Sequence, residues 1–397
     1  MIPLANLLIA IGVIGIFEST VGSIGFAWLL SKLRRKAEPK DSEKDSEGEL
    51  RRLRLDFLIP AHNEEKLICK TLTALDHAKE FFILQSISCS EVIPQIRLRV
   101  GLDHCTDRTQ ERIAEWSHSR RTPPIVTTNR GPVGKWNVLR QLVQESTADW
   151  IAFVDVGSVW HEGLLSAAFP HFHRSSVIGI APSYRQESGS FLENLQWRFE
   201  SWLKLLESDA GGPVSVHGAT VIYRRKFLLE VFQKLNRETW LNDDVVIPLS
   251  LRTHWPFHRI VYLTAKHAWV RDLGVKASRE YGRRKRIALG NLQWIRSLYP
   301  TALRSNLCVG LLASRRVFRT FWAYWLLAIS MGLALHTFRL FHFQAEVIAL
   351  SAAFLALFLV LPFEGGLQRI RSAFLAGLEI PYHLFHSPRT ASEKSWN

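Results

Sequence analysis

The stretch Trp150–Val159 constrains the fold more than any other part of the sequence. It reads W-I-A-F-V-D-V-G-S-V, so an unbroken apolar run leads into Asp155, and a glycine and a serine follow. A continuous apolar run closed by turn residues is typical of a strand buried on both faces of a parallel sheet. An acid at the carboxyl end of such a strand lies in the crevice where α/β sheets bind ligands. Asp155 is therefore a candidate binding residue, although a solvated strand end would give the same pattern.

Strand and helix patterns alternate on the amino-terminal side of this stretch. We expect strands at Arg54–Ile59, Ile96–Leu102 and Ile125–Thr128, and helices from near Glu64, over Thr106–His118 and over Lys135–Glu145. Pro60 should end the first strand, and Asn63 should cap the helix after it. The aromatic-rich segment Ser190–Leu206 has helical spacing. Alternation with short links predicts an α/β domain with a mostly parallel sheet.

Three segments are near the ~20 apolar residues that cross a bilayer. They are Ile2–Leu30, Thr320–Phe338 and Phe343–Pro362. Basic residues follow the first and flank the other two, which predicts a multi-pass protein of the cell inner (cytoplasmic) membrane with a cytoplasmic catalytic domain. The predicted parts are an N-terminal transmembrane helix (1–31), a charged linker (32–50), the α/β domain (51–310), a transmembrane hairpin (311–365) and a C-terminal interfacial or cytoplasmic tail (366–397).

Charge and cysteine content narrow the class of partner. The formal net charge is +14, and the four cysteines form no C-x-x-C pair. Scattered cysteines argue against a zinc site or a disulfide framework. The basic residues gather beside the apolar segments and around Arg283–Arg286, without an aromatic-basic module. They therefore indicate anionic membrane lipids and a diphosphate as partners, and no nucleic acid.

Acids recur where strands end. Glu65 follows the first strand, Asp103 the second and Asp155 the organising strand, while Asp243 and Asp244 stand in N-D-D-V-V-I-P-L. Carboxylates accept hydrogen bonds from ribose and base, and hard cations choose oxygen ligands. Any one of these acids could be a solvated loop residue, but their repeated placement favours a divalent metal ion and a sugar nucleotide.

Seven motifs resemble those of family-2 glycosyltransferases of the GT-A fold, including membrane-bound synthases of extracellular polysaccharides. They occur in the family's order at Ile59–Glu65, Leu102–Thr109, Val133–Leu139, Phe153–Ser158, His217–Arg225, Asn242–Leu249 and Arg283–Gln293. The resemblance covers roughly residues 55–294 and implies an inverting hexosyltransferase that uses a nucleotide-sugar, expected to be a UDP-sugar.

The resemblance also implies a role for each matched residue. Glu65, Asp103 and Lys135 would bind the nucleotide, and Asp155 would bind Mg²⁺ or Mn²⁺ as the first acid of D-x-D. Asp244 would take the proton from the acceptor hydroxyl, with Asp243 beside it in the family's acidic pair. Arg283 and Arg286 lie where processive members carry Q-x-x-R-W and would bind the diphosphate.

Two departures leave alternatives open. Gly157 replaces the second acid of D-x-D, and His267 is either a substitute ligand or a structural histidine. Ile287 replaces the tryptophan of Q-x-x-R-W, which argues against long-chain processivity without an oligomer or a partner subunit. The expected function is transfer of a sugar to a lipid-linked or polysaccharide acceptor. The alternative is a catalytically inactive relative that serves as a nucleotide-binding scaffold in a membrane complex.

Overall fold

A computed structural model describes residues 2–37, 53–89, 94–118, 120–185, 191–236, 239–264, 266–273, 280–341 and 365–380. Its centre is a seven-stranded sheet of order β3-β2-β1-β4-β8-β6-β9. The strands are β1 (Arg54–Ala61), β2 (Gln95–Leu102), β3 (Ile125–Thr128), β4 (Trp150–Val154), β6 (Val177–Ala181), β8 (Thr220–Arg224) and β9 (Arg259–Tyr262). Only β8 runs antiparallel to its neighbours β4 and β6, so the predicted mostly parallel α/β sheet is confirmed.

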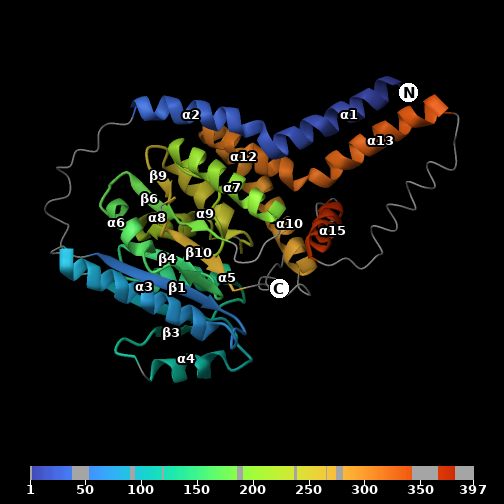
Figure 1. Cartoon of the computed structure of the whole chain (residues 1–397). Helices are drawn as coiled ribbons and strands as arrows, with labels where there is room; N and C mark the ends of the chain where they lie inside the picture. The colour runs from blue at the N-terminus through green and yellow to red at the C-terminus, as the bar shows by residue number, and fades with distance from the viewer. Residues whose placement is uncertain are drawn as a thin grey trace.

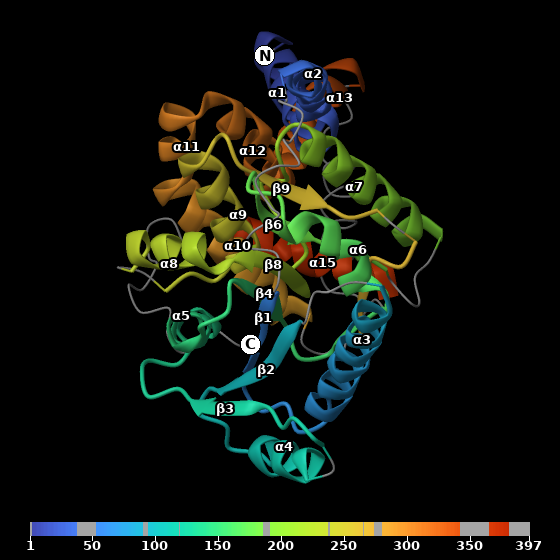
Figure 2. The ribbon, with the colours of Figure 1, turned by 90° about the vertical axis from the view of Figure 1, so that its left-hand side faces the viewer.

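Helices cover both faces of this sheet (Figure 2). One face carries α3 (Ile68–Cys89) and α6 (Leu164–Phe172), and the other carries α5 (Lys135–Glu145), α8 (Arg225–Lys234) and α9 (Asp243–His254). The organising strand β4 is fully buried and divides its side chains between the two sides. Ile151 and Phe153 join the core on the α5 side, whereas Trp150, Ala152 and Val154 join the core on the α3 side. The unbroken apolar run follows from this burial on both faces.

A second, three-stranded sheet lies beside the first. It has the order β5-β10-β7, from β5 (Ser158–Trp160), β7 (Ser183–Tyr184) and β10 (Trp269–Asp272). The remaining helices are α4 (Thr109–Ser117), α7 (Phe191–Asp209), α10 (Glu280–Ser297), α11 (Tyr299–Ser305), α12 (Leu307–Thr320), α13 (Trp322–Phe341) and α15 (Gly365–Leu378).

Three predicted element boundaries were wrong. Strand β1 continues through Pro60 to Ala61, and α3 begins at Ile68 rather than near Glu64. Asn63 adopts a φ of 55° and caps no helix; its side chain accepts hydrogen bonds from the amides of Thr106 and Asp107. This link holds the β1–α3 and β2–α4 loops together, so α4 begins only at Thr109 instead of Thr106.

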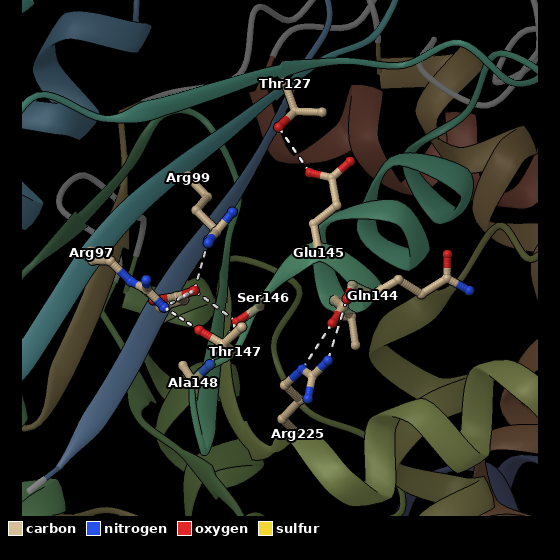
Figure 3. A network of polar contacts seen from close by, with 11 residues as sticks. Arg97, Arg99, Thr127, Gln144, Glu145, Ser146, Thr147, Ala148 and Arg225 are labelled. Atoms are coloured by element: carbon tan, nitrogen blue, oxygen red, sulfur yellow. Dashed lines mark hydrogen bonds and ion pairs between the residues drawn. The ribbon is translucent and has the colours of Figure 1, made fainter.

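A buried ion-pair network holds the amino ends of the central strands (Figure 3). The Asp56 side chain on β1 is fully buried and pairs with Arg97 and Arg99 on β2 at 2.9 Å and 2.7 Å. Ser146, at the end of α5, donates to the same carboxylate at 2.7 Å. The network joins β1, β2 and the α5–β4 connection at the edge of the sheet opposite the acids that follow the strands.

The apolar helices at the two ends of the described chain pack together. α1 (Ile2–Phe17) continues through a π-helical turn (Glu18–Gly22) into α2 (Ser23–Ala37), and α2 lies over α7 and α12. α1 runs beside α13, and this pair stands clear of the α/β body (Figure 1). A Cβ at Gly12 would lie 2.5 Å from the Trp325 carbonyl oxygen, so this glycine permits the close approach.

In the described part of the chain, one helix could cross a membrane by its length and composition. The continuous helix Ile2–Leu33 is long and apolar enough to cross a bilayer. The pair Leu307–Thr320 and Trp322–His336 meets the same criteria only when counted as one span, and it is bent by 61°. The predicted span Phe343–Pro362 lies outside the described residues.

Candidate active site

The carboxyl ends of β1, β2 and β4 meet at one edge of the sheet, and the Asp103 carboxylate is fully buried there. It accepts hydrogen bonds from the Gly134 amide at 2.7 Å and from the Asn129 side chain at 2.6 Å. Asp103 therefore fixes the loop that leads into α5. Gly134 has a φ of 145°, a conformation open to glycine, and Lys135 is the first residue of the helix.

Lys135 joins two of the predicted acids. Its Nζ lies 2.7 Å from Asp155 Oδ1 and 3.2 Å from Asp243 Oδ1. Burial alone would lower the pKa of Lys135, but Asp155 and Asp243 outweigh burial and raise that pKa above its usual value. The lysine is thus firmly cationic and brings the end of β4 and the start of α9 to one point.

Asp243 and Asp244 form the first turn of α9, where the helix dipole favours negative charge. Burial raises the pKa of the Asp244 carboxyl, Arg316 opposes this rise, and Asp243 adds to it. The start of α9 is held by α10, because Asn242 donates to the Ile287 carbonyl at 3.0 Å. A Cβ at Gly290 would lie 2.5 Å from Asn242 Cγ, so glycine is needed for this approach.

Helix α10 brings both predicted arginines to the same region. The charge of Arg286 acts on Lys135, Asp155 and Asp244. The charge of Arg283 acts on His217 and Asp272. A guanidinium beside these acids is suited to a diphosphate, which it can bind with two parallel hydrogen bonds.

Asp272, at the end of β10, is a site residue that the sequence reasoning missed. It pairs with Ser158 across the β5–β10 ladder and accepts a hydrogen bond from the Ser158 hydroxyl at 3.2 Å. Burial raises the pKa of Asp272 to about 6, and the charge of Asp155 adds to the rise. The available signal was the one used elsewhere, an acid at the end of a short apolar strand.

The backbone around Gly157 explains why glycine, and not an acid, occupies the second position of the D-x-D motif. Gly157 has a φ of 96°, which is strained for any residue with a Cβ. Its amide donates to the Thr71 hydroxyl at 2.8 Å, and its carbonyl accepts from the Leu273 amide at 2.8 Å. The second bond fixes the end of β10, and Asp272 with it, against the loop that follows Asp155.

An aromatic wall adjoins these acids. The His217 ring stacks on Tyr184 with centroids 3.7 Å apart, and Trp197 of α7 contacts both rings. The Ala219 amide donates to His217 Nδ1 at 3.1 Å. Burial lowers the pKa of His217 to about 3, and Arg283 contributes to this shift. His217 is therefore neutral, and the wall offers flat apolar surface of the kind that packs on a sugar ring or a base.

Two sequence candidates lie apart from the Lys135 cluster. Glu65 interacts with the β2–α4 loop, where its side chain accepts from the Arg108 amide at 3.3 Å. His267 pairs with His161 at 3.3 Å before β10 begins, whereas Asp272 ends the same strand. Within the described ranges, no group of three or more His, Cys, Asp or Glu side chains could hold a metal ion. Asp155 and Asp272 offer two carboxylates, which suit a hard divalent cation completed by phosphate oxygens.

The sheet order with one antiparallel strand, and the acids that follow its parallel strands, define an α/β transferase of the GT-A type. Residues 56–232 match the family model described as Glycosyl transferase family 2. The chain therefore contains a family-2 glycosyltransferase domain and is a glycosyltransferase, as the sequence motifs predicted.

A solved glycosyltransferase structure shows the same fold. The mannosyltransferase PcManGT from Pyrobaculum calidifontis, in complex with GDP-Man and Mn²⁺, aligns with a TM-score of 0.64 at 15% identity, over 95% of this chain and 99% of that one. Glucosyl-3-phosphoglycerate synthase from Mycobacterium tuberculosis, with Mn²⁺, UDP and phosphoglyceric acid, aligns at 15% identity over 63% and 78% of the chains with a TM-score of 0.40, too low to support an argument. The search of curated proteins found no match.

Proposed function

We propose that this glycosyltransferase moves a sugar from a nucleotide-sugar to a hydroxyl of a membrane acceptor, with inversion at the anomeric carbon. The observation that carries the proposal is the Lys135 bridge, which joins Asp155 and Asp243 beside the half-buried Asp244. Cationic, anionic and proton-accepting groups are thereby combined at the edge of an α/β sheet that binds ligands.

In the proposed reaction Asp244 is the general base. Burial raises the pKa of Asp244 toward neutral pH, and a general base is most effective when its pKa lies near the operating pH. It takes the acceptor proton as the acceptor oxygen attacks the anomeric carbon and the bond to the diphosphate breaks. Lys135, Arg283 and Arg286 would bind the diphosphate and stabilise its developing charge. Asp103 and Glu65 shape the loops on the nucleotide side.

Asp155 and Asp272 would hold the divalent cation, Mg²⁺ or Mn²⁺. Their carboxylates are the oxygen ligands that hard cations prefer, and the charge of Asp155 adds to the effect of burial in raising the pKa of Asp272. When bound, the cation would neutralise charge on the departing diphosphate. Asp272 would supply the carboxylate that Gly157 lacks.

Membrane attachment is supported by the apolar surface of the α1–α13 pair. Leu7, Ile14 and Phe17 on α1 are each more than half exposed, as are Met331 and Leu333 on α13. A contiguous apolar surface of this kind marks contact with a membrane or another protein. We place α1 and α13 in the cytoplasmic membrane, with a lipid or lipid-linked saccharide as the acceptor.

The test is release of nucleoside diphosphate by the purified full chain from a panel of UDP- and GDP-sugars, with membrane lipid extract present. Asp244→Asn should lower the rate at least about 100-fold, because the base is lost. Asp149→Asn is the matched control, since Asp149 precedes β4 at the opposite edge of the sheet and is about half exposed. Chelation of divalent cations should also stop the reaction.

Three results would contradict parts of this proposal. Full activity of Asp244→Asn would remove the assigned base, and full activity in chelator would remove the cation. A chain that binds UDP or GDP but turns over no donor would support the catalytically inactive scaffold, for which Gly157 is the supporting feature.

A further inference from the structure

A cluster of four cations lies where α7 meets α12, next to Asp244. It consists of Lys204 on α7 and Arg315, Arg316 and Arg319 on α12, and we call it the α7–α12 cluster. None of these residues belongs to the motifs that identify the family. The donor-side groups Lys135, Arg283 and Arg286 lie on other helices, α5 and α10.

One carboxylate serves two of the four cations. Glu200 on α7 lies 2.9 Å from Arg315 and 2.6 Å from Arg319. Burial alone would raise the pKa of Glu200, but Arg319 and Arg315 outweigh burial and hold that pKa well below its usual range. Glu200 is thus ionised and fastens α7 to α12.

Lys204 lies one turn further along α7, and its charge acts on His217 in the candidate active site. Its Nζ donates to the Ser215 hydroxyl at 2.7 Å and lies 3.5 Å from Glu207. The next residue, Val216, donates its amide to the Asp244 carbonyl at 2.9 Å. Burial lowers the pKa of Lys204 to about 8, and Arg316 is among the cations that add to this shift.

Arg316 has no anionic partner of its own. It forms no ion pair with any carboxylate in the described ranges, although its charge opposes the burial of Asp244. Within the described residues, the ion pairs of the four cations involve two carboxylates, Glu200 and Glu207. The cluster therefore has surplus positive charge where an acceptor must approach the base.

The α7–α12 cluster also lies close to the start of α13, which belongs to the proposed membrane segment. Helix α12 ends at Thr320, and α13 departs from it along α1 (Figure 1). On α7, Leu195 and Trp202 are each about half exposed. Arg316 on α12 is half-buried, and its charge interacts with Asp244. A headgroup at the membrane surface would reach Arg316 and Asp244 together.

We infer that Arg316, supported by Lys204, binds a phosphate ester of the acceptor and thereby places a neighbouring acceptor hydroxyl at Asp244. A guanidinium fork and an ammonium group match the oxygens of a phosphate. The acceptor oxygen then bonds to the anomeric carbon, the bond to the nucleoside diphosphate breaks, and the proton passes to Asp244. The inference rests on the proposed function for the identity of the base and adds the chemical class of the acceptor.

Lipid retention by the full chain in detergent, measured by native mass spectrometry without any donor, tests this subsite. Phosphatidylglycerol carries a phosphodiester next to hydroxyl groups, and diacylglycerol is the phosphate-free comparison. Arg316→Gln should weaken retention of phosphatidylglycerol at least about tenfold, because a charge-assisted contact is lost. Arg304→Gln on α11 is the matched control, since Arg304 is exposed and causes the same change in net charge. Lys204→Met is a second probe of the same subsite.

Each outcome separates one explanation from another. Displacement of the lipid by glycerol 3-phosphate indicates that a soluble phosphate ester binds in the same way, whereas its failure to compete restricts the subsite to lipid headgroups. Equal retention of both lipids, or equal loss in Arg316→Gln and Arg304→Gln, overturns the inference. UDP and GDP binding by each variant checks the donor site independently.

A transfer assay then distinguishes this inference from the proposed function. With phosphatidylglycerol as acceptor, Arg316→Gln should raise KM at least about tenfold and change kcat less, whereas Asp244→Asn lowers kcat. If no donor turns over at all, the proposed function fails while the retention measurement still stands.

Discussion

The Lys135 bridge predicts a coupling between protein stability and metal binding. The perturbation is Lys135→Met, which keeps the length of the side chain and removes its charge. In the wild type, Nζ lies 2.7 Å from Asp155 and 3.2 Å from Asp243, and only 15% of the lysine side chain is exposed. The variant leaves two neighbouring carboxylates without their shared cation.

The expected cost follows from the exposure of the two acids. Removing one partner of a fully buried ion pair costs about 3–5 kcal/mol. The Asp155 side chain is 38% exposed and keeps part of its hydration, whereas Asp243 is 13% exposed. We therefore expect a loss of about 2–3 kcal/mol. For a domain of this size the loss lowers the unfolding midpoint by roughly 5–10 °C.

Thermal unfolding of the full chain in detergent, with and without Mn²⁺, measures this effect. The Lys135 ammonium pairs with Asp155 and would compete with a bound cation. Mn²⁺ should therefore raise the unfolding midpoint more in Lys135→Met than in the wild type. Lys66→Met is the control, since Lys66 is exposed and its side chain makes no hydrogen bond or ion pair within the described residues. A variant as stable as the wild type, or one that gains no more from Mn²⁺, would refute the reasoning.

Three further predictions concern stability. Burial lowers the pKa of His217 to about 3, so the folded protein is most stable above pH 6.5, where the histidine is neutral in both states. As the pH falls to 5, protonation of His217 in the unfolded chain should lower the free energy of unfolding by about 2 kcal/mol. His217→Gln should weaken this pH dependence in unfolding measured between pH 7 and 5. Asp56→Asn should cost about 3–5 kcal/mol in denaturant unfolding, because the buried Arg99 and the partly exposed Arg97 lose their ion-pair partner. Asp149→Asn, which breaks the exposed pair with Arg54, should cost under about 1 kcal/mol, and equal losses would contradict the prediction. Gly12→Leu should lower the stability measured by thermal unfolding by about 1–3 kcal/mol, because the new side chain would push α1 away from α13. Gly25→Leu is the control and should lower stability less, since a Cβ at Gly25 has no neighbour within 4 Å.

Features set by short segments of sequence could be predicted. The apolar run of β4, the strand β3 and the helix Lys135–Glu145 were all correct, because burial on both faces and helical periodicity are local properties. The boundary after β1 was wrong because Asn63 serves the neighbouring loop rather than its own helix. No pattern within the segment reveals that partner.

For the candidate site, several residues could be predicted from the sequence but the contacts between them could not. Asp155, Lys135 and Asp244 were identified from the sequence, since each lies at the end of a strand or the start of a helix and matches a family motif. That Lys135 binds two acids from distant segments could not be predicted, because the contact depends on how α9 meets the end of β4.

The sequence by itself determined an α/β glycosyltransferase with acids at the ends of its strands and apolar helices beside it. Only the tertiary structure placed Asp272 near Asp155, through the pairing of β10 with β5, and Arg316 near Asp244, through the packing of α12 against α9. The physical reason is that a strand or helix forms from neighbouring residues, whereas a binding site gathers charges that are far apart along the chain.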